Sequence, residues 1–396
     1  MPDYDVSEAL DTDYYGVFSA LGGIPDADRA HWERARQFVD EALPIINDCW
    51  DRAEYPVHLV KRMGELNLLA DGIDVPGLEP MSPLAAGLVN MEISRGDGSL
   101  GTIVAVQGGL ALRSIAFHGS EAQKERWLGP LARGEELGSF ALTEPDHGSD
   151  SVSLETRARL DGDHWVLDGE KKWIGNGASG GVTVVWARDE AGHVRGFLVE
   201  QDAPGYEAEV IEGKASLRAI HQARIRLEGV RVPKHQVLPG ARTFKDTSRV
   251  LVATRLGVAW SALGHATAAY EAALSYATQR VQFRKPLAKF QLVQDRLSQM
   301  LAELTSMQLH CVHLAALDAA GQMRPTQASM AKYHNTRKAR FIASTARDLL
   351  GGNGILLENH VIRHLADIES IHTYEGTESV QALLIGRDVT GVGAFA

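Results

Sequence analysis

The chain lacks the features that would tie it to nucleic acid, to a membrane or to an oxidising compartment. Its 396 residues carry a formal net charge of -11, whereas phosphate-binding surfaces need clustered Lys and Arg. Its two cysteines, Cys49 and Cys311, lie far apart and have no metal-ligand spacing. No uninterrupted apolar run is long enough to span a bilayer, and residues 1–10 are acidic without an apolar signal core. We therefore expect a cytoplasmic protein with reduced cysteines, no metal, no nucleic-acid partner and no membrane insertion.

Other common signals are also missing. No G-x-G-x-x-G follows a strand pattern and opens a helix, so a Rossmann dinucleotide site is not supported. The sequence has no internal repeat and no low-complexity segment. Its apolar fraction of 44% and charged fraction of 23% are ordinary for a soluble globular protein. The length is sufficient for two or three domains with a large buried core.

The first third of the chain has a helical pattern. Apolar residues recur at helical spacing in 31–43, and 122–132 places Trp127 and Leu131 on one side. The segments 84–93 and 109–117 are more uniformly apolar, as helices buried on most sides would be. We predict an N-terminal helical domain over residues 1–136.

The hydrophobic period shortens to about two near Leu137 and stays short to about Gly240. Asp168-Gly169 has the look of a hairpin turn between two strands. Short β-type runs separated by Gly and Asp occupy 156–159, 164–167, 182–187, 194–199 and 223–230. We predict a small, mainly antiparallel β domain over residues 137–241.

The helical period then returns and persists to the C-terminus. Long helices are expected at 250–278, 291–319 and 327–350, and shorter ones at 358–368 and 377–389. Gly351-Gly352 suits the end of the third helix, because glycine adopts the left-handed C-cap conformation. Long helices joined by short loops favour a four-helix bundle over residues 242–396. The predicted fold class is α+β multidomain, in the order helical, β, helical.

One carboxylate near the C-terminus stands in a chemically suggestive place. Glu375 lies in the turn Thr373-Tyr374-Glu375-Gly376-Thr377, directly before an apolar-periodic run. Thr377 is a candidate N-cap for that run, which would put Glu375 beside the positive end of a helix. For an isolated Glu, a solvated position that favours the helix dipole is the better default. The other motifs of the chain change that balance.

Four more segments combine glycine, hydroxyls, basic groups or an aromatic ring. Phe140–Asp150 opens the β domain with Gly and hydroxyls whose free backbone N–H groups suit a polar ring edge or a phosphate. The others are Lys171–Ile174, Arg280–Phe283 and Gly351–Gly354. Taken singly, each has an ordinary interpretation: a turn-rich connection, a core Trp, a solvated Arg and a helix stop.

Taken together and in this order, these segments resemble the acyl-CoA dehydrogenase family over nearly the whole chain. The likeness rests on Phe140–Ser149, Lys172-Trp173-Ile174, Arg280–Phe283, Asp348–Gly354 and Tyr374-Glu375-Gly376-Thr377. The glutaryl-CoA dehydrogenase branch is the most similar part of the family. That closer likeness is carried by Leu349–Gly354, His360–His364, Thr373–Thr377, Ala382-Leu383, Gly386-Arg387 and Thr390-Gly391.

The resemblance implies an FAD-dependent enzyme that desaturates acyl-CoA thioesters between Cα and Cβ. Glu375 would remove the α-proton, while the β-hydrogen would pass as hydride to the flavin. The backbone N–H of Glu375 would help to bind the thioester oxygen. An unperturbed Glu has a pKa of about 4.3 and is a poor base, so burial against an acyl chain and a flavin would have to raise it.

The resemblance also assigns the remaining site residues by position. Neighbours of the flavin ring would be Phe140, Leu142, Thr143, Trp173, Ile174 and Gly175, and those of the phosphates Gly148 and Ser149. Arg280, Phe283, Gln291, Leu349, Gly351 and Gly352 match positions that reach FAD bound mainly to a neighbouring subunit. Thr377 and Phe395 are further FAD neighbours, and the substrate contacts would be Leu100, Ser149, Arg255 and Gly376. The partners implied are a homotetramer built as a dimer of dimers and an electron-transferring flavoprotein as electron acceptor.

Two positions depart from the family pattern. Gly175 stands where the family commonly has a Thr near the flavin N5, so one hydrogen bond to the ring is missing. Leu100 stands where glutaryl-CoA dehydrogenases carry an Arg that pairs with the substrate's far carboxylate. An apolar residue leaves a buried carboxylate uncompensated, and Arg95 and Arg113, though near in sequence, are out of register. We therefore predict a neutral short- or medium-chain acyl-CoA as substrate.

Three alternatives stay open. An acyl-CoA oxidase would pass electrons to dioxygen, and Gly175 is compatible with altered oxygen reactivity. A glutaryl-CoA dehydrogenase proper would also decarboxylate its product. A non-catalytic acyl-CoA-binding protein on the same fold has no need of Glu375, and flavin monooxygenases of this fold typically lack it, so this residue counts against both.

Overall fold

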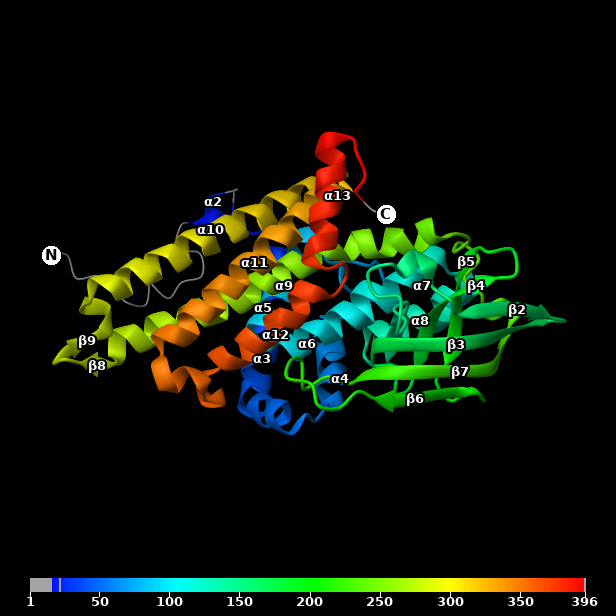
Figure 1. The fold of residues 1–396 in the computed structure, drawn as a ribbon, viewed down its shortest axis with the longest axis horizontal. Helices are drawn as coiled ribbons and strands as arrows, with labels where there is room; N and C mark the ends of the chain where they lie inside the picture. The colour runs from blue at the N-terminus through cyan, green and yellow to red at the C-terminus, as the bar shows by residue number, and fades with distance from the viewer. Residues whose placement is uncertain (1–15, 21–22, 395–396) are drawn as a thin grey trace.

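The computed structural model describes residues 16–20 and 23–394. Helices make up most of its length and a β sheet forms one end, next to α7 and α8 (Figure 1). The N-terminal helices lie beside the C-terminal ones, so the first and last thirds of the chain form one helical body. The predicted fold class, with its order of helical, β and helical parts, is confirmed.

Several of the N-terminal helices begin at side-chain caps. The Ser82 hydroxyl accepts from the Ala85 N–H at 3.0 Å, and Ser120 and Gln123 form a capping box. Each cap satisfies N–H groups that have no partner within the helix. The helices are α2 (Val17–Ala20), α3 (Asp26–Arg52), α4 (Val57–Glu65), α5 (Pro83–Gly96), α6 (Gly98–Val104), α7 (Arg113–His118) and α8 (Glu121–Ala132).

A continuous helical rod, Gly98–His118, crosses this part of the protein. It joins α6 to α7 through a π-helical stretch, η1 (Ala105–Leu112). By length and composition this rod qualifies as a candidate membrane span, contrary to the expectation that no apolar run is long enough. However, 72% of its most apolar window is buried inside the protein. Its apolar surface therefore packs against protein, as in the core helix of a globular domain.

The β domain is a mixed seven-stranded sheet in the order β1-β4-β2-β3-β7-β6, with β5 paired to β4. Most neighbours are antiparallel, as predicted, but β4 runs parallel to both β1 and β2. β1 and β6 were not predicted as strands. The strands are β1 (Gly138–Ala141), β2 (Arg157–Asp161), β3 (His164–Gly175), β4 (Val182–Asp189), β5 (Val194–Glu200), β6 (Tyr206–Val210) and β7 (Gln222–Pro233).

The hairpin predicted at Asp168-Gly169 is wrong. β3 runs through these residues, and the turn lies earlier, where Asp161 of β2 faces His164 of β3. Gly169 marks a register shift against β7 and has a φ of +151°. A Cβ there would lie 2.7 Å from the Thr156 Cα. The glycine therefore allows a close approach of two backbones within the sheet.

Five helices form the C-terminal part, and α11 lies at its centre in contact with the other four. α9 also packs closely on α5, since a Cβ at Gly264 would lie 2.1 Å from the Met91 carbonyl oxygen. The small side chains of this part of α9, including Ala262 and Ala266, allow this approach. The helices are α9 (Phe244–Gln279), α10 (Gln291–Ala319), α11 (Pro325–Leu349), α12 (Val361–Thr373) and α13 (Glu378–Thr390). A small hairpin of β8 (Val281–Gln282) and β9 (Lys285–Pro286) joins α9 to α10 at the end remote from the sheet (Figure 1).

A buried polar network joins the three parts of the chain. Arg363 of α12 donates to the Asp97 carboxylate at the start of α6 and to the Gly96 carbonyl at 3.1 Å. Asp367, one turn further along α12, accepts from the Trp50 indole at 3.0 Å and from the Leu217 N–H of the β domain at 2.6 Å. All three charged side chains are fully buried. We call Asp97, Arg363 and Asp367 the domain junction.

The junction makes a prediction about stability and pH. Burial, followed by the charge of Asp97, raises the pKa of Asp367 to about 7. The pKa in the unfolded chain is about 3.9, so the favourable contribution is complete below that value and is lost as the pH rises through 7. We expect the melting temperature of Asp367→Asn to fall less than that of the wild type between pH 6 and 8.

The histidines at the junction do not obscure this comparison. Burial lowers the pKa of His265 to about 3 and that of His364 well below its ordinary value. Both therefore titrate below the tested window in both proteins. As a control, Asp97→Asn leaves Arg363 buried without its carboxylate and should lower stability at every pH. Parallel melting curves for the wild type and Asp367→Asn would contradict the assignment.

Candidate active site

The loop between α12 and α13 holds its backbone in an uncommon conformation. Glu375 has a φ of +53° and Gly376 a φ of +85°, so two consecutive residues are left-handed. A non-glycine residue there is strained and persists only where the surroundings impose it. The Thr377 hydroxyl accepts from the Val380 N–H at 3.3 Å, which confirms Thr377 as the N-cap of α13. We call residues 374–376 the base loop.

Glu375 lies in a partly buried, charged environment. Its carboxylate accepts from the Thr254 hydroxyl of α9 at 2.5 Å. Burial is the largest influence and raises the pKa of Glu375. The Thr254 hydrogen bond and the charges of Lys332 and Arg255 lower this pKa in part, and Asp71 raises it. The net pKa lies above the ordinary value, which makes the carboxylate a stronger base near neutral pH.

Asp71 is the second carboxylate of this region, and it is already paired. Its carboxylate accepts from Arg113 at 2.8 Å and from the Asn90 amide at 2.8 Å. A Cβ at Gly109 would lie 3.2 Å from Asp71 and 3.4 Å from the Thr254 methyl. Gly109 therefore lies between Asp71 and Thr254, the residue whose hydroxyl binds Glu375.

The other arginine noted beside Leu100 in sequence is also engaged. Arg95 donates to Glu271 at 2.8 Å and to Glu92 at 2.7 Å. Leu100 itself is fully buried in an apolar cluster with residues such as Leu69. A carboxylate at Leu100 would meet apolar groups there.

Arg255 follows Thr254 on α9 and faces the same region. Its side chain donates to the Ser329 hydroxyl at 3.3 Å, and burial lowers its pKa while Glu375 raises it. No ion pair to a carboxylate is found for Arg255 within the described residues. Its charge is therefore available to a ligand that comes close to the base loop, as the predicted contact with CoA requires.

A buried ion pair organises the loop that opens the β domain. Lys171 of β3 is completely buried and donates to Glu144 at 2.8 Å, to the Leu142 carbonyl at 3.2 Å and to the Trp186 carbonyl at 2.7 Å. Glu144 also accepts from the Glu155 N–H at 2.6 Å. Burial raises the pKa of Glu144, but Lys171 and these donors outweigh it, so the net pKa is lowered. The loop that carries Leu142, Thr143, Gly148 and Ser149 is thus built around this pair.

Trp173 is presented to solvent by a β-bulge. The register between β3 and β7 shifts between Lys171 and Ile174, and Trp173 has a φ of +65°. Its side chain is 54% exposed, so the interpretation as a core Trp is wrong. A large exposed aromatic on a rigid bulge suits a flat ring system as ligand. Phe140 and Ile174 are instead buried, in the clusters on either side of the sheet.

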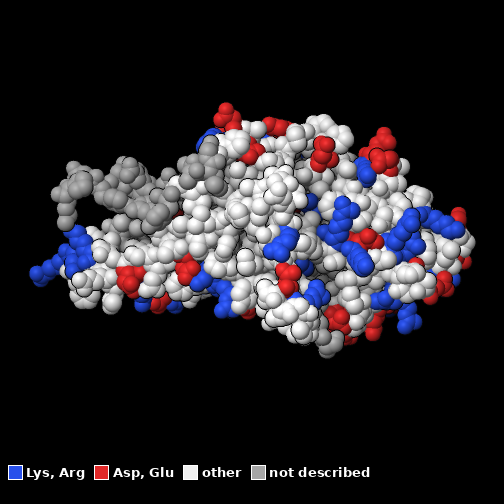
Figure 2. Space-filling view, turned by 90° about the horizontal axis from the view of Figure 1, so that it is seen from above, with Lys and Arg blue, Asp and Glu red and all other residues white. Residues whose placement is uncertain are grey.

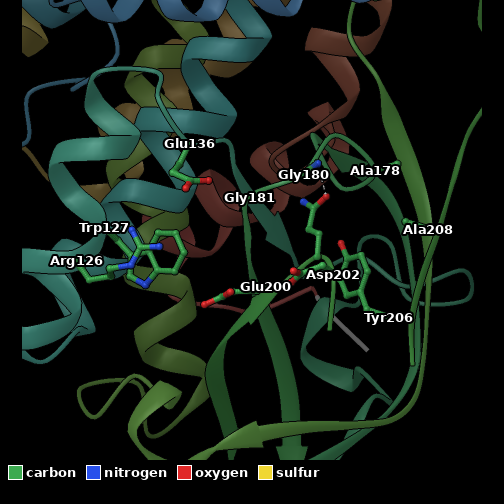
Figure 3. A pocket seen from close by; sticks show the side chains of 11 residues that line it. Arg126, Trp127, Glu136, Ala178, Gly180, Gly181, Glu200, Asp202, Tyr206 and Ala208 are labelled. Carbon is green, nitrogen blue, oxygen red and sulfur yellow. Dashed lines mark hydrogen bonds between the residues drawn. The ribbon is translucent and has the colours of Figure 1, made fainter. Parts of the chain in front are cut away.

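A separate hollow of about 580 Å³ lies between the end of α8 and the sheet (Figure 3). Its lining includes Arg126, Trp127, Glu200 and Tyr206. None of the site residues predicted from the sequence lines it. The hollow is therefore separate from the chemistry around Glu375 and Trp173.

Family models cover the chain in three consecutive pieces. The N-terminal domain of acyl-CoA dehydrogenases matches residues 25–135, the middle domain 139–230 and the C-terminal domain 244–390. The chain belongs to the acyl-CoA dehydrogenase family. It is an oxidoreductase, and its cofactor is FAD.

Individual relatives agree with this assignment. The mitochondrial short-chain specific acyl-CoA dehydrogenase of Bos taurus is 36% identical over 374 residues, covering 91% of this chain and 90% of the relative. Glutaryl-CoA dehydrogenase from Mycobacterium smegmatis superposes with a TM-score of 0.94 at 40% identity, covering 97% and 99% of the two chains. Butyryl-CoA dehydrogenase from Megasphaera elsdenii gives 0.88 at 28% identity, covering 93% and 99%.

The residues of this acyl-CoA dehydrogenase fit its flavin on one side of the molecule. The exposed Trp173, the loop held by Glu144 and Lys171, and the open space beside Gly148 lie together on the β domain. Exposed Ser149 and partly exposed Thr143 belong to the same loop. When bound, FAD would supply the redox chemistry of the oxidoreductase.

The other predicted flavin positions lie elsewhere in the chain. Phe283 is 88% exposed on the β8–β9 hairpin, at the end of the molecule remote from the sheet (Figure 1). Arg280, Gln291, Gly351 and Gly352 are also exposed, while Leu349 is buried. Within one chain, the Phe283 region and Trp173 therefore lie at opposite ends of the molecule. Phe395 lies outside the described residues.

Several residues around the site were missed in the sequence analysis. Thr254, Asp71 and Gln381 contact Glu375 or its neighbours, and no local pattern marks them. Lys332 had a detectable signal, because it lies in helical phase with the buried Ala328 and Ala339 of α11. A lysine in an apolar stripe indicates a specific buried partner.

Gly175 is explained by its neighbour on the helical rod. A Cβ at Gly175 would lie 2.7 Å from a methyl of Val106. Val106 therefore occupies the space into which a side chain at position 175 would point. With Val106 in this place, the Thr that the family commonly has at position 175 would not fit.

This pairing is testable by a double-mutant cycle. Gly175→Thr alone should cost about 1–3 kcal/mol of stability through overpacking. Adding Val106→Ala should recover most of that loss, because it frees the space. Urea unfolding of the four proteins, followed by tryptophan fluorescence, measures the coupling. Strictly additive effects would show that the two positions do not compete for space.

Proposed function

We propose that this protein desaturates a neutral short- or medium-chain acyl-CoA thioester, with Glu375 as the base that removes the α-proton. The proposal rests chiefly on Glu375, a partly buried carboxylate with a raised pKa, held in a left-handed loop. Such strain is characteristic of functional positions. The raised pKa suits a base that must accept a proton from a weak carbon acid.

We assign supporting roles to other residues around Glu375. Thr254 orients the carboxylate through its hydrogen bond at 2.5 Å. The backbone N–H of Glu375 is our candidate donor to the thioester oxygen, where negative charge develops as the α-proton leaves. Arg255 supplies positive charge for the CoA moiety. Gly376 leaves room at the loop, since a Cβ there would lie 2.5 Å from the Gln381 amide nitrogen.

The arrangement of cations supports a neutral acyl group. Leu100 is surrounded by apolar side chains. Arg95 and Arg113 are each bound to carboxylates of the protein. A second carboxylate on the substrate would thus have to be buried near Asp71 and Glu375, where we assign the one unpaired arginine, Arg255, to the CoA moiety, and this burial is costly. The likeness to short-chain and butyryl-CoA dehydrogenases agrees with this substrate class.

The second candidate is a decarboxylating glutaryl-CoA dehydrogenase. The observation in its favour is the 40% identity and TM-score of 0.94 to such an enzyme from Mycobacterium smegmatis. We infer that this likeness reflects the shared scaffold, with an electron-transferring flavoprotein as the acceptor in either case.

Anaerobic reduction of the flavin distinguishes the two substrates. We expect butyryl-CoA to bleach the visible flavin band and glutaryl-CoA to leave it, because Arg95 and Arg113 are already paired within the protein and Arg255 is assigned to CoA. Bleaching by glutaryl-CoA alone, with release of carbon dioxide, would replace the first function by the second. Slow reoxidation of the reduced enzyme in air separates a dehydrogenase from an oxidase.

Glu375→Gln provides the control for the base. It should retain FAD and bind acyl-CoA, while reduction slows by about 10²–10⁴-fold, the usual contribution of a positioned base. Reduction at nearly the wild-type rate would assign the proton transfer to another residue.

We also propose a homotetramer built as a dimer of dimers. Phe283, Leu292 and Val389 are large apolar residues that are 88%, 79% and 76% exposed in the single chain. In the view from above, Lys and Arg gather towards the sheet and at the opposite end of the molecule, and fewer charged residues are seen between them (Figure 2). A second copy would cover these surfaces and bring its Phe283 region to the flavin side of its neighbour.

Sedimentation equilibrium tests the assembly. We expect a mass four times the 43.0 kDa of one chain. Phe283→Asp should weaken the assembly and FAD retention together, because the exposed ring would face the neighbouring subunit. A stable monomer that retains FAD would contradict the proposal.

A further inference from the structure

Lys332 is a buried lysine in the middle of the central helix α11. Its side chain is 1% exposed, and the ammonium donates to the backbone carbonyls of Tyr374 and Gly376. These two carbonyls lie on either side of Glu375. The lysine thus reaches across from α11 and binds both ends of the base loop.

The base loop needs such donors because its backbone is strained. A residue held in the left-handed region is strained and persists only where the surrounding structure imposes it. The Gln381 amide donates to the Glu375 carbonyl at 3.2 Å and to the Gly376 carbonyl at 3.0 Å. With Lys332, all three carbonyls of the loop have a buried donor. The conformation that displays Glu375 is therefore imposed from α11 and α13.

A neutral donor would be sufficient to bind two carbonyls, so the charge of Lys332 requires its own explanation. A buried ammonium is costly unless a negative charge compensates it. Within the described residues no carboxylate forms an ion pair with Lys332 at hydrogen-bond distance. Glu375 is the charge that interacts favourably with it, whereas Arg255 opposes it. The charge of Lys332 is thus directed at the carboxylate of the base.

We propose that Lys332 is a positioning residue for the base: its ammonium holds the two carbonyls that flank Glu375 and its positive charge favours the ionised carboxylate. This inference rests on the proposed role of Glu375 as the base. Lys332 binds backbone oxygen atoms of the loop, so it acts on the reaction through Glu375.

The titration behaviour agrees with this geometry. Burial lowers the pKa of Lys332 to about 7, while Glu375 raises it and Arg255 lowers it. Glu375 in turn faces Lys332 of α11, Arg255 of α9 and Asp71 of the segment before α5. His372 of α12 also lies within electrostatic range of Lys332. Because Lys332 lowers the pKa of Glu375, its neutralisation should move the acidic limb of the pH–rate profile to higher pH.

Three substitutions separate the hydrogen bonds from the charge. Lys332→Arg retains both, Lys332→Gln retains a donor without charge, and Lys332→Met retains neither. The matched control is Lys338→Met, which removes an α11 lysine that pairs at the surface with Glu303 at 2.6 Å. All four are studied as FAD-loaded holoenzymes, with the flavin content measured first.

The readout is the rate of flavin reduction by butyryl-CoA in anaerobic stopped flow across pH 5.5–9. We expect Lys332→Met to reduce the limiting rate about 100-fold, as misplacement of a reacting group by roughly 1 Å does. Its acidic limb should move up by about one pH unit, the usual effect of losing an opposite charge. Lys332→Gln should show the same shift with a smaller loss of rate, and Lys332→Arg should restore the limb.

Each outcome bears on the inference. A slow Lys332→Met with an unmoved acidic limb, or an Arg variant no better than Gln, would reduce Lys332 to a structural residue. If Lys332→Met does not fold, the comparison of Gln with Arg decides. A Glu375→Gln enzyme that reduces flavin normally would instead overturn the role of Glu375, whatever the Lys332 variants show.

Discussion

The position of Glu375 depends on how α12 is held, and α12 is held by buried charge. Arg363 and Asp367 connect it to Asp97 of the N-terminal helices and to Leu217 of the β domain. Breaking one member of such a network leaves an uncompensated charge in the interior. All three parts of the chain must therefore assemble around α12 before the base loop at its end acquires a defined place.

Buried charged side chains also hold the two loops that carry the predicted site residues. Lys171 is buried beneath the loop of residues 142–149 and binds Glu144 and two carbonyls, and Lys332 is buried beneath the base loop and binds two carbonyls. Buried charges contribute little net stability compared with apolar side chains. What they provide here is directional contact with backbone oxygen atoms in irregular segments that no regular secondary structure satisfies.

The acyl-CoA dehydrogenase scaffold is thus combined with local choices specific to this chain. Gly175 on the β domain has no side chain, and the apolar side chain of Val106 on the helical rod fills the space beside it. Arg95 and Arg113 are bound to carboxylates of the protein. Both features concern which side chain lies beside which in the folded protein.

The amino-acid sequence by itself determined the elements whose signals are local. The helix expected at 291–319 is α10, with the same bounds, because its apolar period is sustained over many turns. Thr377 was identified as an N-cap from its own hydroxyl and the run that follows it. The motifs and their order indicated the family, because each motif consists of a few consecutive residues and is visible in the sequence.

The tertiary structure alone decided the features that depend on distant partners. The bulge that exposes Trp173 arises from the pairing of β3 with β7, and Asp168-Gly169 was misread because its glycine meets Thr156 across the sheet. The left-handed conformation of Glu375 and the partners of Lys332 follow from the packing of α11 against a loop some forty residues later. Local periodicity records which face of an element is apolar, but it does not record what lies opposite that face.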